Sequence, residues 1–265
     1  MQKMFLFVMT YVTINDMKRY YSSTKPYFKR KRLRIGFRIF KAILKLFFPK
    51  NEFIWKCERP GDNDSFIFVC NHTKLYAPLA FLLNYDKPIR TWSLAYLLFY
   101  KEMMRHMFFN ILKDRKPKIL LYPLTVILSP LILWFFRSIE PIPVYHQERK
   151  ILDTFNKAVE TAQSGVHQIV FPEDNKAPLA NDYIFELHRG FTYVAKLLYD
   201  KTGKIMKFYP VYTSQKLRKV LIGPPISYDP QVKLKIQKEQ ICKYLENGIK
   251  ELADSLPQHK ITIAK

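Results

Sequence analysis

Two short apolar segments are each followed by side chains that can transfer protons or bind ions. His72 follows residues 65–70, which read as a short buried strand, and Glu173 follows residues 168–171, a second strand ended by Pro172. An imidazole in a loop at a strand's end is well placed to take a proton from a bound hydroxyl. Parallel strands bring such loops to one edge of a sheet. We therefore expect a site with His72 as general base and Glu173 close by.

The elements that must position these residues alternate between strand and helix. Apolar residues at helical spacing predict helices over residues 151–162, 191–198 and 241–252, with Gly165 and Gly203 ending the first two. Further strands are expected at residues 207–212 and 220–222, and a linker around residues 49–64. This order predicts an α/β fold in which helices flank a mainly parallel sheet.

Four short blocks, taken in order, resemble the lysophospholipid (1-acylglycerol-3-phosphate) acyltransferase family. The similarity covers roughly residues 50–255, and the blocks are Asn71-His72, Ile142-Pro143-Val144-Tyr145, Phe171-Pro172-Glu173 and Tyr209-Pro210-Val211. The resemblance implies a sheet-and-helix core of the glycerolipid-acyltransferase type. It also implies transfer of a fatty acyl group from acyl-CoA or acyl-carrier protein to a lysophospholipid hydroxyl, with no metal or redox cofactor.

The resemblance also assigns roles to individual residues. His72 would be the catalytic base. The expected substrate-binding residues are Asn71, Thr73, His146, Arg149, Phe171, Pro172, Glu173 and Lys176. Cations in this set, or Lys74, would neutralise the phosphate of the acceptor's head group.

The chain departs from the family pattern at three positions. Five residues after His72, where the family has an orienting Asp, stands Ala77. His146 stands in the place of an Arg, and Asp174 in the place of a Gly. Glu173 or Asp174 would compensate for Ala77 if the loops converge. Two hypotheses follow: an acyltransferase with divergent site chemistry, or a non-catalytic protein that binds lipid or acyl donor.

The charge of the chain is concentrated near its beginning. The formal net charge is +22, and residues 1–60 hold 15 Lys and Arg but three acids. Within residues 33–48 the cations Arg34, Arg38, Lys41 and Lys45 recur at helical spacing among apolar residues. Such a basic amphipathic helix is typical of a segment that lies in a bilayer interface, the alternative being a helix packed on the core.

The longest uncharged stretch, residues 119–136, contains Pro123 and Pro130. Two prolines weaken a straight helix, so we expect a broken helix or hairpin that dips into one leaflet. A true crossing and a buried core segment are the alternatives. The apolar residues 4–14 are too few to span a bilayer and suggest an interfacial or buried helix.

These features predict a membrane-associating segment over residues 1–50 and an acyltransferase-like domain over residues 51–265. The expected partner is the anionic, cytoplasmic face of a membrane, together with the acyl donor and a lysophospholipid-like acceptor. No nucleic acid is expected, because the basic residues alternate with apolar ones and no base-reading motif accompanies them. Three cysteines without a C-x-x-C pair, and histidines without ligand spacing, predict reduced thiols and no metal.

Overall fold

The computed structural model describes residues 31–61, 64, 66–111, 118–145 and 150–259. The chain forms two compact units. One includes the chain up to Ala42 and Tyr96–Ser138, and the other includes Ile43–Ala95 and the chain from Ile139 onward. We call the second the sheet unit and the first the helical unit.

An eight-stranded sheet forms the centre of the sheet unit, with its strands in the order β1-β7-β6-β2-β5-β3-β4 and β8 paired to β6. Five of the pairings are parallel, and only β7 and β8 run antiparallel to β6. The strands are β1 (Glu52–Trp55), β2 (Phe66–Cys70), β3 (Ile89–Leu94), β4 (Ile142–Val144), β5 (His167–Val170), β6 (Lys207–Ser214), β7 (Lys219–Ile222) and β8 (Ile226–Ser227). This confirms the predicted α/β class with its mainly parallel sheet.

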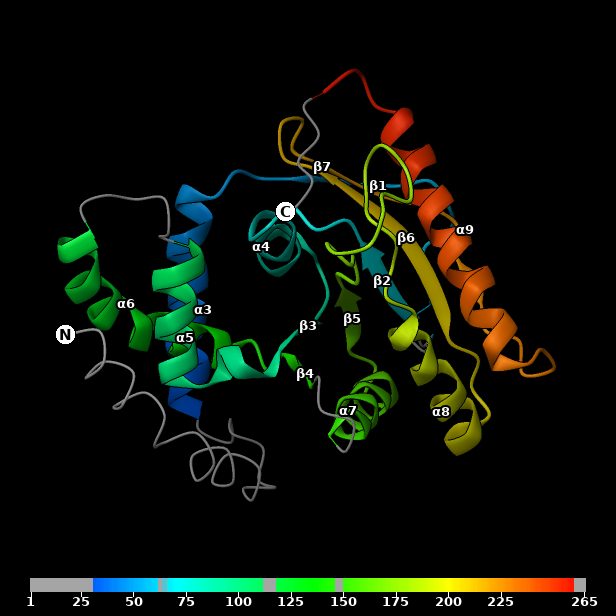
Figure 1. Cartoon of the computed structure of the whole chain (residues 1–265), viewed down its shortest axis with the longest axis horizontal. Coiled ribbons are helices and arrows are strands. Elements are labelled where there is room, and N and C mark those ends of the chain that lie inside the picture. The colour runs from blue at the N-terminus through cyan, green and yellow to red at the C-terminus, as the bar shows by residue number, and fades with distance from the viewer. Residues whose placement is uncertain (1–30, 62–63, 65, 112–117, 146–149, 260–265) are drawn as a thin grey trace. The chain divides into compact units, whose positions relative to one another are not determined.

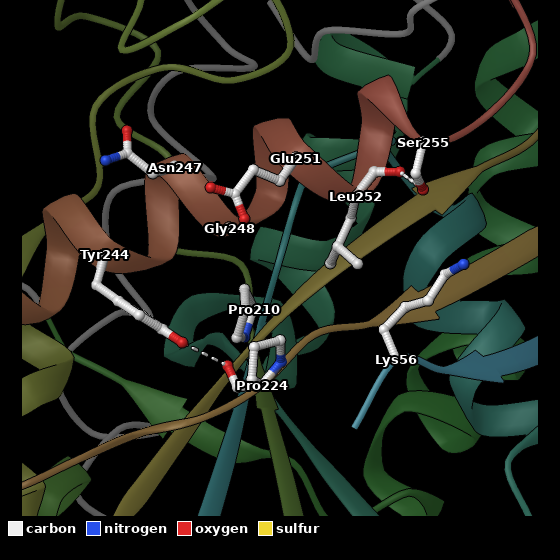
Figure 2. Close-up of a pocket in the computed structure, with 9 residues that line it drawn as sticks. All are labelled: Lys56, Pro210, Pro224, Tyr244, Asn247, Gly248, Glu251, Leu252 and Ser255. Carbon is white, nitrogen blue, oxygen red and sulfur yellow. Dashed lines mark hydrogen bonds between the residues drawn. The ribbon is translucent and has the colours of Figure 1, made fainter. Parts of the chain in front are cut away.

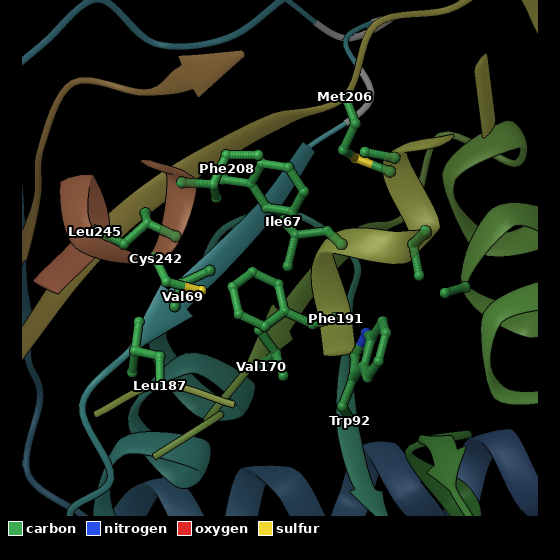
Figure 3. Packing of buried hydrophobic residues seen from close by; sticks show 14 of the residues in the cluster. Ile67, Val69, Trp92, Val170, Leu187, Phe191, Met206, Phe208, Cys242 and Leu245 are labelled. Atoms are coloured by element: carbon green, nitrogen blue, oxygen red, sulfur yellow. The ribbon is translucent and has the colours of Figure 1, made fainter. Parts of the chain in front are cut away.

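Helices cover both faces of this sheet (Figure 1). The helices of the unit are α4 (Tyr76–Asn84), α7 (Ile151–Gln163), α8 (Tyr193–Thr202) and α9 (Leu234–Asp254), with a 3-10 turn at Arg189–Thr192. Alternate strand residues such as Val69 and Phe208 pack against α7, α8 and α9 (Figure 3). The opposite strand residues, Phe68 and Cys70 among them, pack with α4.

Most of the expected helices and strands are present, and two of the helices end at the glycines that the sequence indicated. Gly203 ends α8 in the left-handed conformation with a φ of 70°, and Gly165 after α7 has a φ of 69°. The expected linker at residues 49–64 is wrong in part, because Glu52–Trp55 forms β1. Its register with β7 runs from Glu52 opposite Lys219 to Trp55 opposite Ile222.

The helical unit contains α5 (Tyr100–His106), α6 (Lys118–Ser138) and a π-helical turn at Met107–Ile111. A 3-10 turn at Ala95–Leu98 begins at the last residue of the Ile43–Ala95 part of the sheet unit. Met103, Met107 and Leu133 form the small buried core of the helical unit. The basic amphipathic segment is also helical, as α3 (Lys31–Phe47), which belongs in part to each unit. The helix expected over residues 4–14 lies outside the described residues.

The expected break in residues 119–136 is wrong, since α6 is one continuous helix that contains both Pro123 and Pro130. Pro130 has no N–H to donate to the carbonyl of Val126. The hydroxyl of Tyr100 on α5 donates to that carbonyl instead, at 3.3 Å. A partner from a neighbouring helix thus satisfies the group that the proline leaves free.

Within the described residues, one helical stretch is long and apolar enough to cross a membrane, Leu121–Ser138. Only 17% of that stretch is buried. Ile127 is 71% exposed, so the helix presents much of its apolar surface. Its insertion into a bilayer stays a prediction.

Candidate functional site

The candidate site lies where β2 and β5 end side by side. The two strands are parallel, with Val69 opposite Val170, so the residues that follow them share one edge of the sheet. His72 comes two positions after β2, and Glu173 comes three positions after β5. The expected convergence of the two loops is therefore present.

Asn71 holds the start of the His72 loop against β6. Its side-chain amide donates to the carbonyl of Thr213 at 3.3 Å, and its oxygen accepts the Thr213 N–H at 2.7 Å. The side chain is buried and extends the strand pairing past the end of β2. Nothing in the sequence near Asn71 points to Thr213, 142 positions away. A contact between Asn71 and substrate stays a prediction.

The next residues form a tight turn into α4. The hydroxyl of Thr73 accepts the backbone N–H of Ala77 at 3.0 Å, and the Thr73 carbonyl accepts that of Tyr76 at 3.0 Å. Both bonds satisfy N–H groups of the first turn of the helix. Lys74, the next residue of the turn, has a φ of 53°. This is a left-handed conformation that is costly for a residue with a Cβ. Strain of this kind is concentrated at functional sites.

Glu173 ties the two strand ends together through its carboxylate. One oxygen accepts the backbone N–H of His72, and the other accepts the N–H of Phe185 at 3.2 Å. Burial raises the pKa of Glu173 to about 7, against the opposing effect of these two donors. This carboxylate therefore titrates close to neutral pH, and it holds the backbone beside His72.

His72 has a half-buried imidazole whose ring centre lies 5.6 Å from that of Phe171. Its Nδ1 atom is buried and has no hydrogen-bond partner among the described residues. Burial lowers the pKa of this imidazole, and its own backbone opposes the change only in part. A lowered pKa favours the neutral ring, which is the state a general base requires.

Neither of the two carboxylates suggested as substitutes for the missing Asp reaches Nδ1 of His72. Both oxygens of Glu173 bind backbone N–H groups. Asp174 faces Nε2 of His188 at 3.5 Å and accepts the N–H of Lys176 at 3.0 Å. Ala77 itself is fully buried in the cluster that α4 forms on the sheet. In the described part of the chain, therefore, neither Glu173 nor Asp174 takes the place of the family's orienting Asp.

The other predicted substrate-binding residues differ in their exposure to solvent. Pro172 is buried, Phe171 is half-buried, and Lys176 is exposed. His146 and Arg149 lie outside the described residues. The structure thus joins His72, Phe171 and Glu173, while the assigned contacts with substrate stay predictions.

A separate hollow of about 350 Å³ lies beside α9, on the side of β6 opposite α4 (Figure 2). Its floor contains Pro210 and Pro224, and the hydroxyl of Tyr244 donates to the Pro224 carbonyl at 3.2 Å. Gly248 lies so close to Pro210 that a Cβ there would be 2.9 Å from the proline ring. Glycine is required at this position because the helix packs directly on the strand.

Comparison with known proteins finds a similarity in structure but none in sequence. No family profile matches the chain, and no curated protein matches it. A solved structure, the 1-acyl-sn-glycerophosphate acyltransferase PlsC from Thermotoga maritima, matches with a TM-score of 0.43 and 16% identity. The match covers 96% of this chain and 88% of that one.

Proposed function

We propose that this protein transfers a fatty acyl group from acyl-CoA or acyl-carrier protein to a hydroxyl of a lysophospholipid. The main support is the geometry at the edge of the sheet where β2 and β5 end. There the backbone N–H of His72 donates to the Glu173 carboxylate, and the His72 ring lies beside the ring of Phe171. These residues belong to two of the four ordered blocks that resemble the acyltransferase family.

The proposed chemistry uses His72 as a base. A ring nitrogen takes the proton of the acceptor hydroxyl, and the oxygen attacks the thioester carbonyl. The C–S bond then breaks, and the leaving thiolate takes the proton back from the imidazolium. Phosphate on the acceptor would bind the cations predicted for this site, and no metal or redox cofactor takes part.

The absence of an orienting carboxylate at position 77 is expected to lower the rate of acyl transfer. In a serine-protease triad, loss of the carboxylate that holds the imidazole lowers the rate by about 10⁴. Here the buried Nδ1 of His72 has no acceptor among the described residues, so the tautomer with a bare Nε2 is not favoured. We therefore expect slow transfer.

The same observation favours a second candidate function, a protein that binds lipid or acyl donor without transferring the chain. With Nδ1 unpartnered among the described residues, no carboxylate supports the imidazolium. Binding depends less on that atom than catalysis does, so a protein with this site can hold lipid while turning over little.

A transfer assay tests the first proposal. Purified protein is incubated with labelled acyl-CoA or acyl-carrier protein and a panel of lysophospholipids, beside His72→Ala and His106→Ala. His106 is a half-buried histidine on α5 and is the matched control. We expect His72→Ala to abolish transfer and His106→Ala to retain it. Wild-type transfer no higher than that of His72→Ala, with lipid binding intact, would replace the first function by the second.

We further propose that the chain works at the cytoplasmic face of an anionic membrane. The support is the basic α3, the exposed apolar surface of α6 and the concentration of charge before residue 61.

A further inference from the structure

The rim of the sheet unit beside His72 carries a cluster of exposed apolar and basic side chains. Leu46 and Phe47 are 81% and 82% exposed, and Leu75 is 51% exposed. Lys50, Lys74 and Arg218 are exposed as well. We call these six residues the rim patch.

Contacts around Tyr76 bring the three chain segments of the rim patch together. The ring of Phe48, next to Phe47, lies 5.1 Å from the ring of Tyr76. The Tyr76 hydroxyl donates to the side-chain oxygen of Asn51 at 2.7 Å. The backbone N–H of Glu52 donates to the Arg218 carbonyl at 2.9 Å. These contacts hold three segments that are far apart in the sequence close to one another.

The topology places the rim patch at the same edge of the sheet as His72. β6 runs parallel to β2, and β1 and β7 run antiparallel to β6. The carboxyl ends of β2 and β6, the start of β7 and the start of β1 therefore meet at one edge. Lys74 and Leu75 lie in the turn that begins at His72.

The charge of the rim patch is not neutralised locally. Among the described residues, no carboxylate lies within ion-pair distance of Lys50, Lys74 or Arg218. The nearby carboxylate of Glu52 is 3.8 Å from Lys219. Lys74 and Arg218 also have φ values of 53° and 54°, so two basic residues stand at turns that favour Gly or Asn.

We propose that the rim patch is a docking surface for an anionic lipid bilayer. Exposed apolar side chains surrounded by cations match the interface of such a bilayer, where the chains enter the boundary and the cations meet the head groups. Docking through this rim would present the His72 loop to the membrane surface. The rim patch shares Leu46 and Phe47 with the end of α3 and extends that predicted membrane segment onto the sheet unit through Lys74, Leu75 and Arg218. The docking surface therefore rests on the proposed association with an anionic membrane.

The test is flotation of the full-length chain with vesicles of phosphatidylserine and phosphatidylcholine, and with phosphatidylcholine alone. The charge variant is Lys74→Asn with Arg218→Asn, because Asn tolerates the left-handed backbone. Each basic residue near such a surface strengthens binding several-fold, so we expect binding to the anionic vesicles to fall about 30-fold at low salt. The matched control is Lys201→Asn with Lys204→Asn, two exposed cations at the opposite edge of the sheet, which should bind like wild type.

Two further variants separate the apolar part of docking from its charge and from the proposed chemistry. Leu75→Ser removes an apolar side chain that would be buried in the bilayer, and it changes no charge. It should therefore weaken the part of vesicle binding that persists at high salt. His72→Ala should float like wild type, so failure of the proposed chemistry and failure of this docking surface are distinguishable. Unchanged flotation of the charge variant, or an equal loss in the opposite-edge control, would overturn the proposal. So would a wild type that does not float with anionic vesicles.

Discussion

Replacing Glu173 by Gln should make the protein more stable at alkaline pH and leave its stability at acidic pH unchanged. The carboxyl group has a pKa of about 7 in the folded chain, raised by burial from its usual 4.5. Between these values the folded state binds more protons than the unfolded state, so stability falls as the pH rises. At about 1.4 kcal/mol for each pH unit, the loss is about 3 kcal/mol above pH 7.

The Gln side chain resembles the protonated carboxyl, because it is neutral and offers one acceptor to the N–H groups of His72 and Phe185. Urea unfolding of both proteins from pH 4.5 to 8 should therefore give equal free energies of unfolding at the acidic end. At the alkaline end the variant should be more stable by about 3 kcal/mol. Glu186→Gln, a change at an exposed carboxyl in the same segment, is the control. A difference that does not vary with pH would refute the burial argument.

Two further predictions concern residues that hold the site and the helix behind it. Asn71→Leu removes both hydrogen bonds to Thr213 and should lower the free energy of unfolding by about 2–4 kcal/mol, since it leaves buried backbone groups unpaired. A loss under about 0.5 kcal/mol in urea unfolding would contradict that role. Gly248→Ala should cost about 1–3 kcal/mol, because the new methyl group meets Pro210. Gly190→Ala, whose methyl group meets nothing within 4 Å, is its control, and equal thermal shifts in the two would be evidence against direct packing of α9 on β6.

The periodic part of the fold was predictable from the sequence. The helices α7 and α9 show apolar residues at helical spacing, and β2, β5 and β6 are short apolar runs with clear ends. β1 was not predicted, because a run of four residues with only partly buried apolar side chains is a weak signal, and its pairing partner β7 lies 167 positions away in the sequence. The continuity of α6 depends in the same way on a hydroxyl from α5.

The proximity of His72, Phe171 and Glu173 was predictable from the sequence, but the interactions that these residues make were not. The sequence pointed to His72 and Glu173 at adjoining strand ends. It could not show that Glu173 binds backbone N–H groups, or that Nδ1 of His72 lacks a partner in the described chain. Such partners are fixed by loop geometry, which residue types and spacing do not determine.

We propose that His72 is a catalytic base whose rate is limited by the absence of a carboxylate at position 77. The most direct measurement is the rate of acyl transfer by Ala77→Asp, beside Ala77→Asn as a neutral control of the same shape. We expect Asp to raise the rate by about 10² or more, Asn to leave it nearly unchanged, and His72→Ala to abolish the gain. A folded Ala77→Asp protein that transfers no faster than wild type would contradict the claim.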